Sequence, residues 1–192
     1  MNPPESRRVV ITGLGVISPV GNTPDELVAS LRELKSGIAT LTQIPTGVLP
    51  IDHGAEVTAF TGAIEDYGPL PKELQRTIRK GSKLMCREIE MGVAAAQLAL
   101  HHAALTSDAR DRDRTGVIYG CDYIMTLPEE FAAGIKACLD EKGEFHFENW
   151  ADCGLPQVNP LWLLKYLPNM PASHIAIYND LRGPNNSITL RE

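Results

Sequence analysis

Short β-branched apolar runs alternate with amphipathic segments along this chain. Residues 9–14 (VVITGL) and 115–120 (TGVIYG) have the composition of strands that are covered on both faces. Apolar residues at helical spacing predict a long helix over residues 72–105, whose many alanines suit it to deep burial. Further helices are predicted over residues 129–139 and in the stretches LWLLKYL and SHIAIYN. This alternation of strands and helices indicates an α/β fold.

The first helix has a start signal in the residues 23–26, TPDE. Threonine at the cap, proline at the first helical position and glutamate three residues after the threonine form a capping box, and Ser-Gly at residues 36–37 predicts the helix end. The next segment, residues 38–71, is rich in Gly, Pro and Thr. It is predicted to be a long irregular excursion, with one strand at residues 57–63, that forms an insertion or a partner-contact surface.

Composition and charge limit the possible partners. A chain of 192 residues is long enough for one domain and a full core, and its 43% hydrophobic and 22% charged residues are typical of globular proteins. The net charge of −6 argues against general binding to nucleic acid or to an anionic membrane. No apolar run has membrane-spanning length, and the first residues lack the apolar core of a signal peptide, so a cytoplasmic location is expected.

The residue patterns of common cofactor sites are missing or incomplete. The cysteines lack zinc-ligand spacing and are expected to be reduced, and no metal is expected; they are Cys86, Cys121, Cys138 and Cys153. Gly13 and Gly15 partly match a dinucleotide fingerprint, but Ser18 replaces the third glycine, so a tight structural turn is favoured and no nucleotide is expected. The paired carboxylates at residues 129–130 are interpreted as a solvated face or a helix cap.

Basic side chains recur at spacings of three and four within the predicted long helix. A helix would place them in one positive stripe on an acidic molecule, and they are Lys72, Arg76, Arg79, Lys80, Lys83 and Arg87. This pattern has two open interpretations. The stripe docks an acidic partner, or it is an ordinary solvated face.

Several stretches together resemble one protein family. They are RRVVITGLGVISPVGNTPDEL, KSGIATL, MGVAAAQLALHHAAL, TGVIYG and LPNMPASHIAIYNDLRGPNNSIT. In this order and spacing they resemble the β-ketoacyl-acyl carrier protein synthases, the condensing enzymes of fatty acid and polyketide assembly. The resemblance implies a thiolase-like α/β fold with a mixed sheet layered by helices, and residues 1–192 correspond to an incomplete N-terminal portion of it.

The resemblance also places the family's nucleophile. In relatives the Arg-Gly-Pro turn leads through a short strand to Thr-Ala-Cys, and an ungapped alignment puts Leu190, Arg191 and Glu192 at these three positions. A cysteine at a helix N-terminus is favoured as a thiolate that attacks acyl thioesters, whereas a glutamate cannot form the acyl-thioester intermediate. The family's catalytic histidines and lysine lie in the part that follows. The chain is therefore expected to be unable to elongate acyl chains.

Two functions remain open on this resemblance. One is a β-ketoacyl synthase-like protein that acts on carrier-bound acyl chains, and the other is a non-catalytic partner subunit like the chain-length factors. Either implies an acyl carrier protein and a homodimer or a heterodimer with a synthase subunit as partners. Lys80 and Lys83 match basic positions of the family's carrier-protein docking region. Tyr123 matches the residue that gates the acyl pocket in relatives, although simple packing is the favoured interpretation of this side chain.

Overall fold

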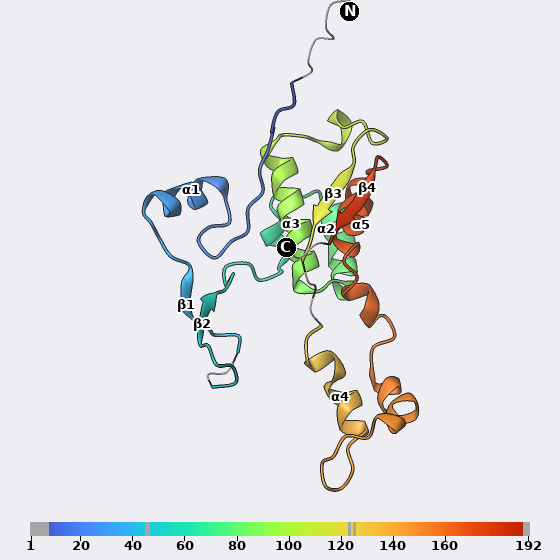
Figure 1. Ribbon diagram of the computed structural model, residues 1–192. Helices are drawn as coiled ribbons and strands as arrows, with labels where there is room; N and C mark the ends of the chain where they lie inside the picture. The colour runs from blue at the N-terminus through green and yellow to red at the C-terminus, as the bar shows by residue number, and fades with distance from the viewer. Residues whose placement is uncertain (1–7, 45–46, 123, 125, 190–192) are drawn as a thin grey trace, which may run out of the picture. The chain divides into compact units, whose positions relative to one another are not determined.

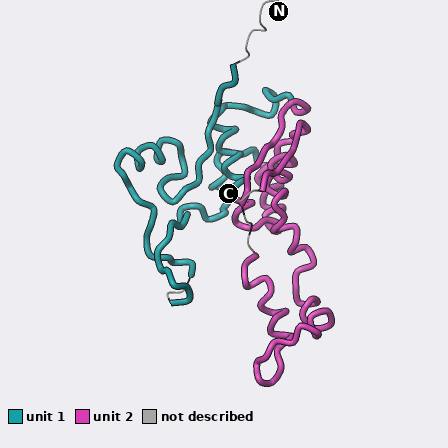
Figure 2. The backbone as a smooth tube through the Cα atoms, viewed as in Figure 1, with its two compact units in different colours: residues 1–71, 91–111 teal, residues 72–90, 112–192 magenta. Residues whose placement is uncertain are grey.

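The computed structural model describes residues 8–44, 47–122, 124 and 126–189. The chain divides into two compact units, residues 1–71 with 91–111 and residues 72–90 with 112–192 (Figure 2). The division falls within the helix α3 (Arg87–His102) and again after the 3-10 turn η3 (Ser107–Ala109). Within the described residues, no helix is both long and apolar enough to cross a bilayer.

The first unit begins with the capped helix α1 (Pro24–Arg32) (Figure 1). The Thr23 hydroxyl accepts a hydrogen bond from the Glu26 N–H at 3.2 Å, and the Glu26 carboxylate accepts one from the Asn22 N–H at 2.8 Å. This reciprocal pair confirms the predicted start. The predicted end at residues 36–37 is wrong, because Leu34 already adopts a left-handed conformation with φ of 53°.

A small antiparallel pair follows in the first unit. Strand β1 (Ile38–Thr40) pairs with β2 (His53–Ala55), and the 3-10 turn η1 (Ile64–Tyr67) comes later. The strand predicted at residues 57–63 is wrong, because the backbone there makes local bonds. The carboxylate of Asp66 accepts hydrogen bonds from the N–H groups of Thr61 and Gly62, at 2.7 and 3.0 Å. Phe60 lies in the core of this unit beside Tyr67, with ring centroids 6.1 Å apart.

The glycine pair near the start of the chain packs closely against α3. A Cβ atom on Gly13 would lie 2.4 Å from the Ala99 carbonyl oxygen, and one on Gly15 would lie 1.9 Å from that of Ala95. The predicted strand at residues 9–14 is wrong: no strand is assigned there, and Val9 is 98% exposed. A β-strand needs hydrogen bonds to a neighbouring strand, and an apolar sequence alone does not provide that partner. The glycines therefore serve helix packing.

The single long helix predicted over residues 72–105 is also wrong. The chain forms α2 (Lys72–Gly81), the 3-10 turn η2 (Ser82–Leu84) and then α3, with Met85 extended at φ −115° and ψ 139°. Gly81 lies against the second unit's Tyr178, whose hydroxyl oxygen would be 1.9 Å from a Cβ atom at position 81. This glycine ends α2. The prediction that α3 is buried is confirmed, since Ile89, Val93 and Ala94 are fully buried.

The second unit contains a parallel strand pair. Strand β3 (Val117–Gly120) pairs with β4 (Asn185–Ile188), and Val117 lies opposite Asn185. The helix α5 (Met170–Asn179) packs against both strands (Figure 1). Val117 is buried, whereas the next residue, Ile118, is 76% exposed on the other face. The prediction of a strand in TGVIYG and of a helix in SHIAIYN is confirmed.

An aromatic lobe lies between β3 and α5 in the sequence. Helix α4 (Glu129–Ala137) confirms the predicted helix, and it packs against the turns that follow. The ring of Phe131 contacts Trp162 edge-on, with centroids 5.0 Å apart, and lies 6.2 Å from Trp150. The 3-10 turn η7 (Trp162–Lys165) replaces the helix predicted in LWLLKYL. Three further turns precede it: η4 (Phe147–Asn149), the π-helical turn η5 (Trp150–Gly154) and η6 (Leu155–Gln157).

Candidate functional site

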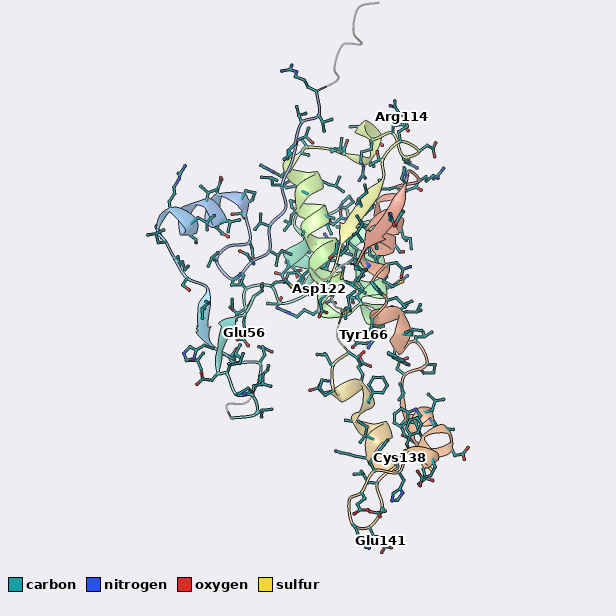
Figure 3. The ribbon with its side chains drawn as sticks, viewed as in Figure 1. Glu56, Arg114, Asp122, Cys138, Glu141 and Tyr166 are labelled. Atoms are coloured by element: carbon teal, nitrogen blue, oxygen red, sulfur yellow. The ribbon has the colours of Figure 1, made fainter. Side chains whose placement is uncertain are left out.

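The carboxyl ends of β3 and β4 lie side by side and define the candidate site. The N–H of Cys121, directly after β3, donates to the carbonyl oxygen of Ile188 at the end of β4, at 3.0 Å. Asp122 follows β3 (Figure 3) and Thr189 follows β4. Ligands of α/β folds bind beyond the carboxyl ends of parallel strands. The two loops that leave these strands are therefore the natural places for chemistry.

The Arg-Gly-Pro turn fixes how β4 enters this pair. The N–H of Arg182 donates to the carbonyl oxygen of Arg112 at 2.8 Å, and the N–H of Gly183 donates to that of Thr115 at 3.0 Å. A Cβ atom on Gly183 would lie 2.7 Å from the Thr115 backbone, so only glycine fits here. The turn thereby aligns the start of β4 with the start of β3.

An ion cluster holds the same turn from the side of α5. Asp180, at the helix end, adopts a left-handed conformation with φ of 49°. Its carboxylate accepts hydrogen bonds from Arg112 Nη1 at 2.6 Å and from Arg182 Nε at 3.0 Å. The hydrogen bond from Arg182, together with the charges of both arginines, holds the pKa of Asp180 below its usual value. Helix end, turn and strand entry are thus tied together.

The thiols near the carboxyl end of β3 are kept protonated. Burial, followed by the negative charges of Glu88 and Asp122, raises the pKa of Cys121. Burial raises the pKa of Cys86 to about 12 and also raises that of Tyr119. The reactive form of a cysteine is the thiolate. This environment therefore does not activate either thiol as a nucleophile.

Two of the predicted site residues cannot be placed from the structure. Tyr123 and Glu192 lie outside the described residues, as do the neighbouring Leu190 and Arg191. Asp122 and Ile124 flank the first position, and Thr189 is the described residue nearest to the second; Asp122 and Thr189 follow the paired ends of β3 and β4.

The two predicted docking residues lie on the surface of the second unit. Lys80 is in the last turn of α2 and Lys83 is in η2, and both are exposed. The opposite side of α2 is anchored by the buried Ile78. All six side chains of the basic segment are exposed; they are Lys72, Arg76, Arg79, Lys80, Lys83 and Arg87. The prediction of one continuous stripe is wrong, because the break at η2 takes Lys83 and Arg87 out of the helical register of α2.

Glu130 belongs to a cluster of side chains that the sequence does not predict, and the prediction of a solvated face or a helix cap for it is incomplete. The Glu130 carboxylate accepts a hydrogen bond from Lys165 Nζ at 2.7 Å and one from the Tyr166 hydroxyl at 3.1 Å. The bond from Lys165 lowers the pKa of Glu130, and burial raises that of Tyr166 to about 12. The partners are 35 and 36 residues away along the chain, so no local pattern signals the cluster.

A second missed pair lies within α5. His174 is 7% exposed, and its Nδ1 atom is 3.1 Å from the Tyr178 hydroxyl. Burial lowers the pKa of His174 and raises that of Tyr178 to about 12, so both side chains are neutral at physiological pH. Their spacing of four residues in a helix could have predicted this contact.

Comparison with known proteins identifies the class of fold. One solved structure, described as the ishigamide ketosynthase/chain length factor, matches 95% of this chain and 40% of its own with a TM-score of 0.66 at 22% identity. Another, a type II PKS acyl-carrier protein in complex with its ketosynthase, matches 96% of this chain and 42% of its own with a TM-score of 0.58 at 19% identity. The fold is the thiolase-like α/β fold of the ketosynthases, of which the chain forms the N-terminal part.

The family assignment follows from sequence. The model of the β-ketoacyl synthase N-terminal domain matches residues 6–189, so the chain belongs to the β-ketoacyl synthase family. The 3-oxoacyl-acyl-carrier-protein synthase 2 of Synechocystis sp. is 29% identical over 182 residues, which are 95% of this chain and 38% of the relative. The enzyme of the same name from Vibrio harveyi is 30% identical and is also covered over 38% of its length. The chain thus spans well under half the length of these relatives.

Proposed function

We propose that this chain is the incomplete N-terminal part of a β-ketoacyl synthase-like protein that handles carrier-bound acyl chains without a cysteine nucleophile. The parallel pair of β3 and β4 supports this function, because the Arg-Gly-Pro turn directs β4 as the family motif requires. Counting from Ile188, the family's cysteine position falls on Glu192. A carboxylate there is compatible with a helix N-terminus but cannot hold an acyl thioester.

A non-catalytic partner subunit is the second candidate function. On the ungapped alignment, Leu190, Arg191 and Glu192 stand at the positions of the family's Thr-Ala-Cys, which would be more than the loss of the nucleophile alone. The similarity in fold to a ketosynthase/chain length factor structure is consistent with such a subunit. Either function implies a dimer with a copy of the protein or with a synthase subunit, and Tyr123 lining the acyl pocket. Either function also suits a cytoplasmic protein.

A loading experiment tests the loss of acyl transfer. The purified chain is incubated with an acyl-carrier protein that bears a thioester-linked acyl group, and the intact mass is measured. The Synechocystis relative serves as the positive control. We expect an adduct on the relative and none on this chain, because Glu192 offers no thiol and Cys121 stays protonated. An acyl adduct on Glu192 or on any cysteine of this chain would overturn the proposal.

For the basic segment we propose docking of an acidic acyl-carrier protein. Of the seven charged side chains within residues 72–87, six are basic and only Glu73 is acidic. The charge of Arg87 also acts on Glu90, just beyond this segment. The net charge of the whole chain is −6, so this positive surface is local. Complementary charge accelerates encounter and fixes orientation more than it adds affinity. Lys80 and Lys83, at the break between α2 and α3, are the residues assigned to this contact.

Charge reversal tests the docking surface. The double variant Lys80→Glu/Lys83→Glu is expected to weaken binding of the carrier protein about tenfold at low salt, at up to ~1 kcal/mol for each exposed ion pair. The same difference is expected to shrink at high salt, because exposed charges are screened. Lys142→Glu changes an exposed lysine of the same unit and is the matched control. An unchanged dissociation constant for the double variant at low salt would remove the docking proposal.

A further inference from the structure

Two cysteines of the second unit belong to two elements that pack against each other, α4 and η5. Cys138 caps the end of α4 and is 1% exposed. Cys153 lies in the π-helical turn η5, which packs against α4, and it is exposed. One sulfur is therefore open to solvent and the other is enclosed by the same lobe.

The backbone of η5 touches the buried sulfur. A Cβ atom on Gly154 would lie 2.9 Å from Cys138 Sγ and 2.4 Å from the Trp150 ring, so only glycine allows this approach. The N–H of Gly154 donates a hydrogen bond to the Cys138 sulfur. Cys153 is joined to Gly154 by one peptide bond. The turn thus brings the backbone of Cys153 beside the sulfur of Cys138.

A rigid hairpin fixes Cys138 at this contact. Its carbonyl oxygen accepts a hydrogen bond from the N–H of His146, and its own N–H donates to Ile135, both at 3.0 Å. The Asp140 carboxylate accepts a hydrogen bond from the Glu144 N–H at 2.9 Å and so closes the turn. In Figure 3 Cys138 lies at the end of α4, and Glu141 lies in the hairpin beyond it. Cys138 cannot easily swing away from η5.

We propose that Cys153 and Cys138 form a redox pair that closes a reversible disulfide between η5 and the end of α4. The exposed Cys153 meets a hydroperoxide first: its thiolate attacks the peroxide oxygen, giving a sulfenic acid and releasing hydroxide or an alkoxide. The Cys138 sulfur then attacks the sulfenic sulfur, and water leaves with the thiol proton. In balance, two thiols and one hydroperoxide give one disulfide, one water and one further water or alcohol.

The environments of the two sulfurs fit these roles. Cys138 is 1% exposed, so oxidants in solution do not reach its sulfur, whereas η5 lies against it. Burial, and then the nearby Cys153, also raises the pKa of Cys138. The cross-link would close a loop from residue 138 to residue 153 that contains the whole hairpin. Such a link restricts the unfolded chain, so the oxidised lobe is expected to unfold at a higher temperature. A thiol reductant reverses the step by exchange.

Peptide mapping tests the pair directly. The full chain is treated with hydrogen peroxide, unfolded with its free thiols blocked, and digested with trypsin without reductant. Cleavage after Lys136, Lys142 and Lys165 places Cys138 in the peptide 137–142 and Cys153 in the peptide 143–165. We expect these two peptides to be recovered as one disulfide-linked species, which separates on reduction. In the same sample Cys86 and Cys121 are expected to remain blocked thiols.

Matched variants make every result decisive. Cys153→Ser, a change at an exposed position, should abolish the linked species, while Cys121→Ser should retain it. Cys138→Ser should leave Cys153 trapped as a sulfenic acid that dimedone labels. If this buried change prevents folding, the exposed change Cys153→Ser still tests the pair. Recovery of Cys153 as an unmodified thiol, only as a sulfinic acid, as a link between two chains, or joined to Cys86 or Cys121 would overturn the proposal.

Discussion

Replacement of Gly15 by alanine tests the close packing between the start of the chain and α3. The added Cβ atom would lie 1.9 Å from the Ala95 carbonyl oxygen and 2.8 Å from the Ala99 nitrogen. Both are backbone atoms of a helix, so no side chain can rotate to make room. Gly15 does not have a positive φ, so the cost is steric. Overpacking typically costs about 1–3 kcal/mol, and we expect Gly15→Ala at the upper end of that range.

Urea unfolding followed by circular dichroism measures this cost. At a slope of about 2 kcal/mol per molar urea, a loss of ~2–3 kcal/mol lowers the midpoint by about 1 M or slightly more. Gly120→Ala is the matched control, since a Cβ atom there meets nothing within 4 Å and the backbone has no positive φ. It should be neutral or slightly stabilising, by up to ~1 kcal/mol. Equal midpoints for the two variants would refute the packing argument.

Two further predictions concern the second unit. Tyr166→Phe removes the hydrogen bond to Glu130, and because Tyr166 is buried we expect a loss of about 1 kcal/mol in the same unfolding assay; an unchanged midpoint would contradict it. His146 lies between Glu148 and Asp140, and hydrogen bonds to these carboxylates raise its pKa in the folded protein. These hydrogen bonds therefore stabilise the fold fully below the pKa of the unfolded chain, near 6.5, and the stabilisation is lost as the pH rises through the pKa of the folded protein. Titration of the imidazole by NMR should give a pKa above 6.5, and His146→Gln should reduce the pH dependence of unfolding between pH 6 and 8; an ordinary pKa would refute this reasoning.

Patterns in short stretches of sequence correctly predicted the elements that depend on residues close together in the chain. The capping pattern at residues 23–26 located the start of α1, since the Thr23 and Glu26 side chains bond to nearby N–H groups. The strand in TGVIYG and the helix in SHIAIYN were predicted from the apolar residues of each segment. The long helix over residues 72–105 failed because apolar periodicity continues through the break. Gly81 and the extended Met85 end the helix there despite that pattern.

Contacts between distant residues were beyond prediction from these patterns. Arg112 and Asp180 are separated by 68 positions, yet their ion pair secures the turn that leads into β4. Neither residue belongs to a recognisable motif, and charged residues in loops are usually solvated. The cluster of Glu130 with Lys165 and Tyr166 likewise joins residues that are distant in the sequence. Family resemblance identified the role of the Arg-Gly-Pro turn but not the residues that hold it.

The environment of Cys121 bears on whether a neighbouring sulfur could replace the family's nucleophile. Cys121 is bonded through its N–H to the last residue of β4, four positions before Glu192. Proximity alone would make it a candidate acyl acceptor. Burial and the charges of Glu88 and Asp122 raise its pKa, however, so little thiolate is present at neutral pH. An acyl thioester delivered to this end of the sheet would therefore meet a protonated thiol. The expected absence of an acyl adduct in the loading experiment therefore holds for Cys121 as well as for Glu192.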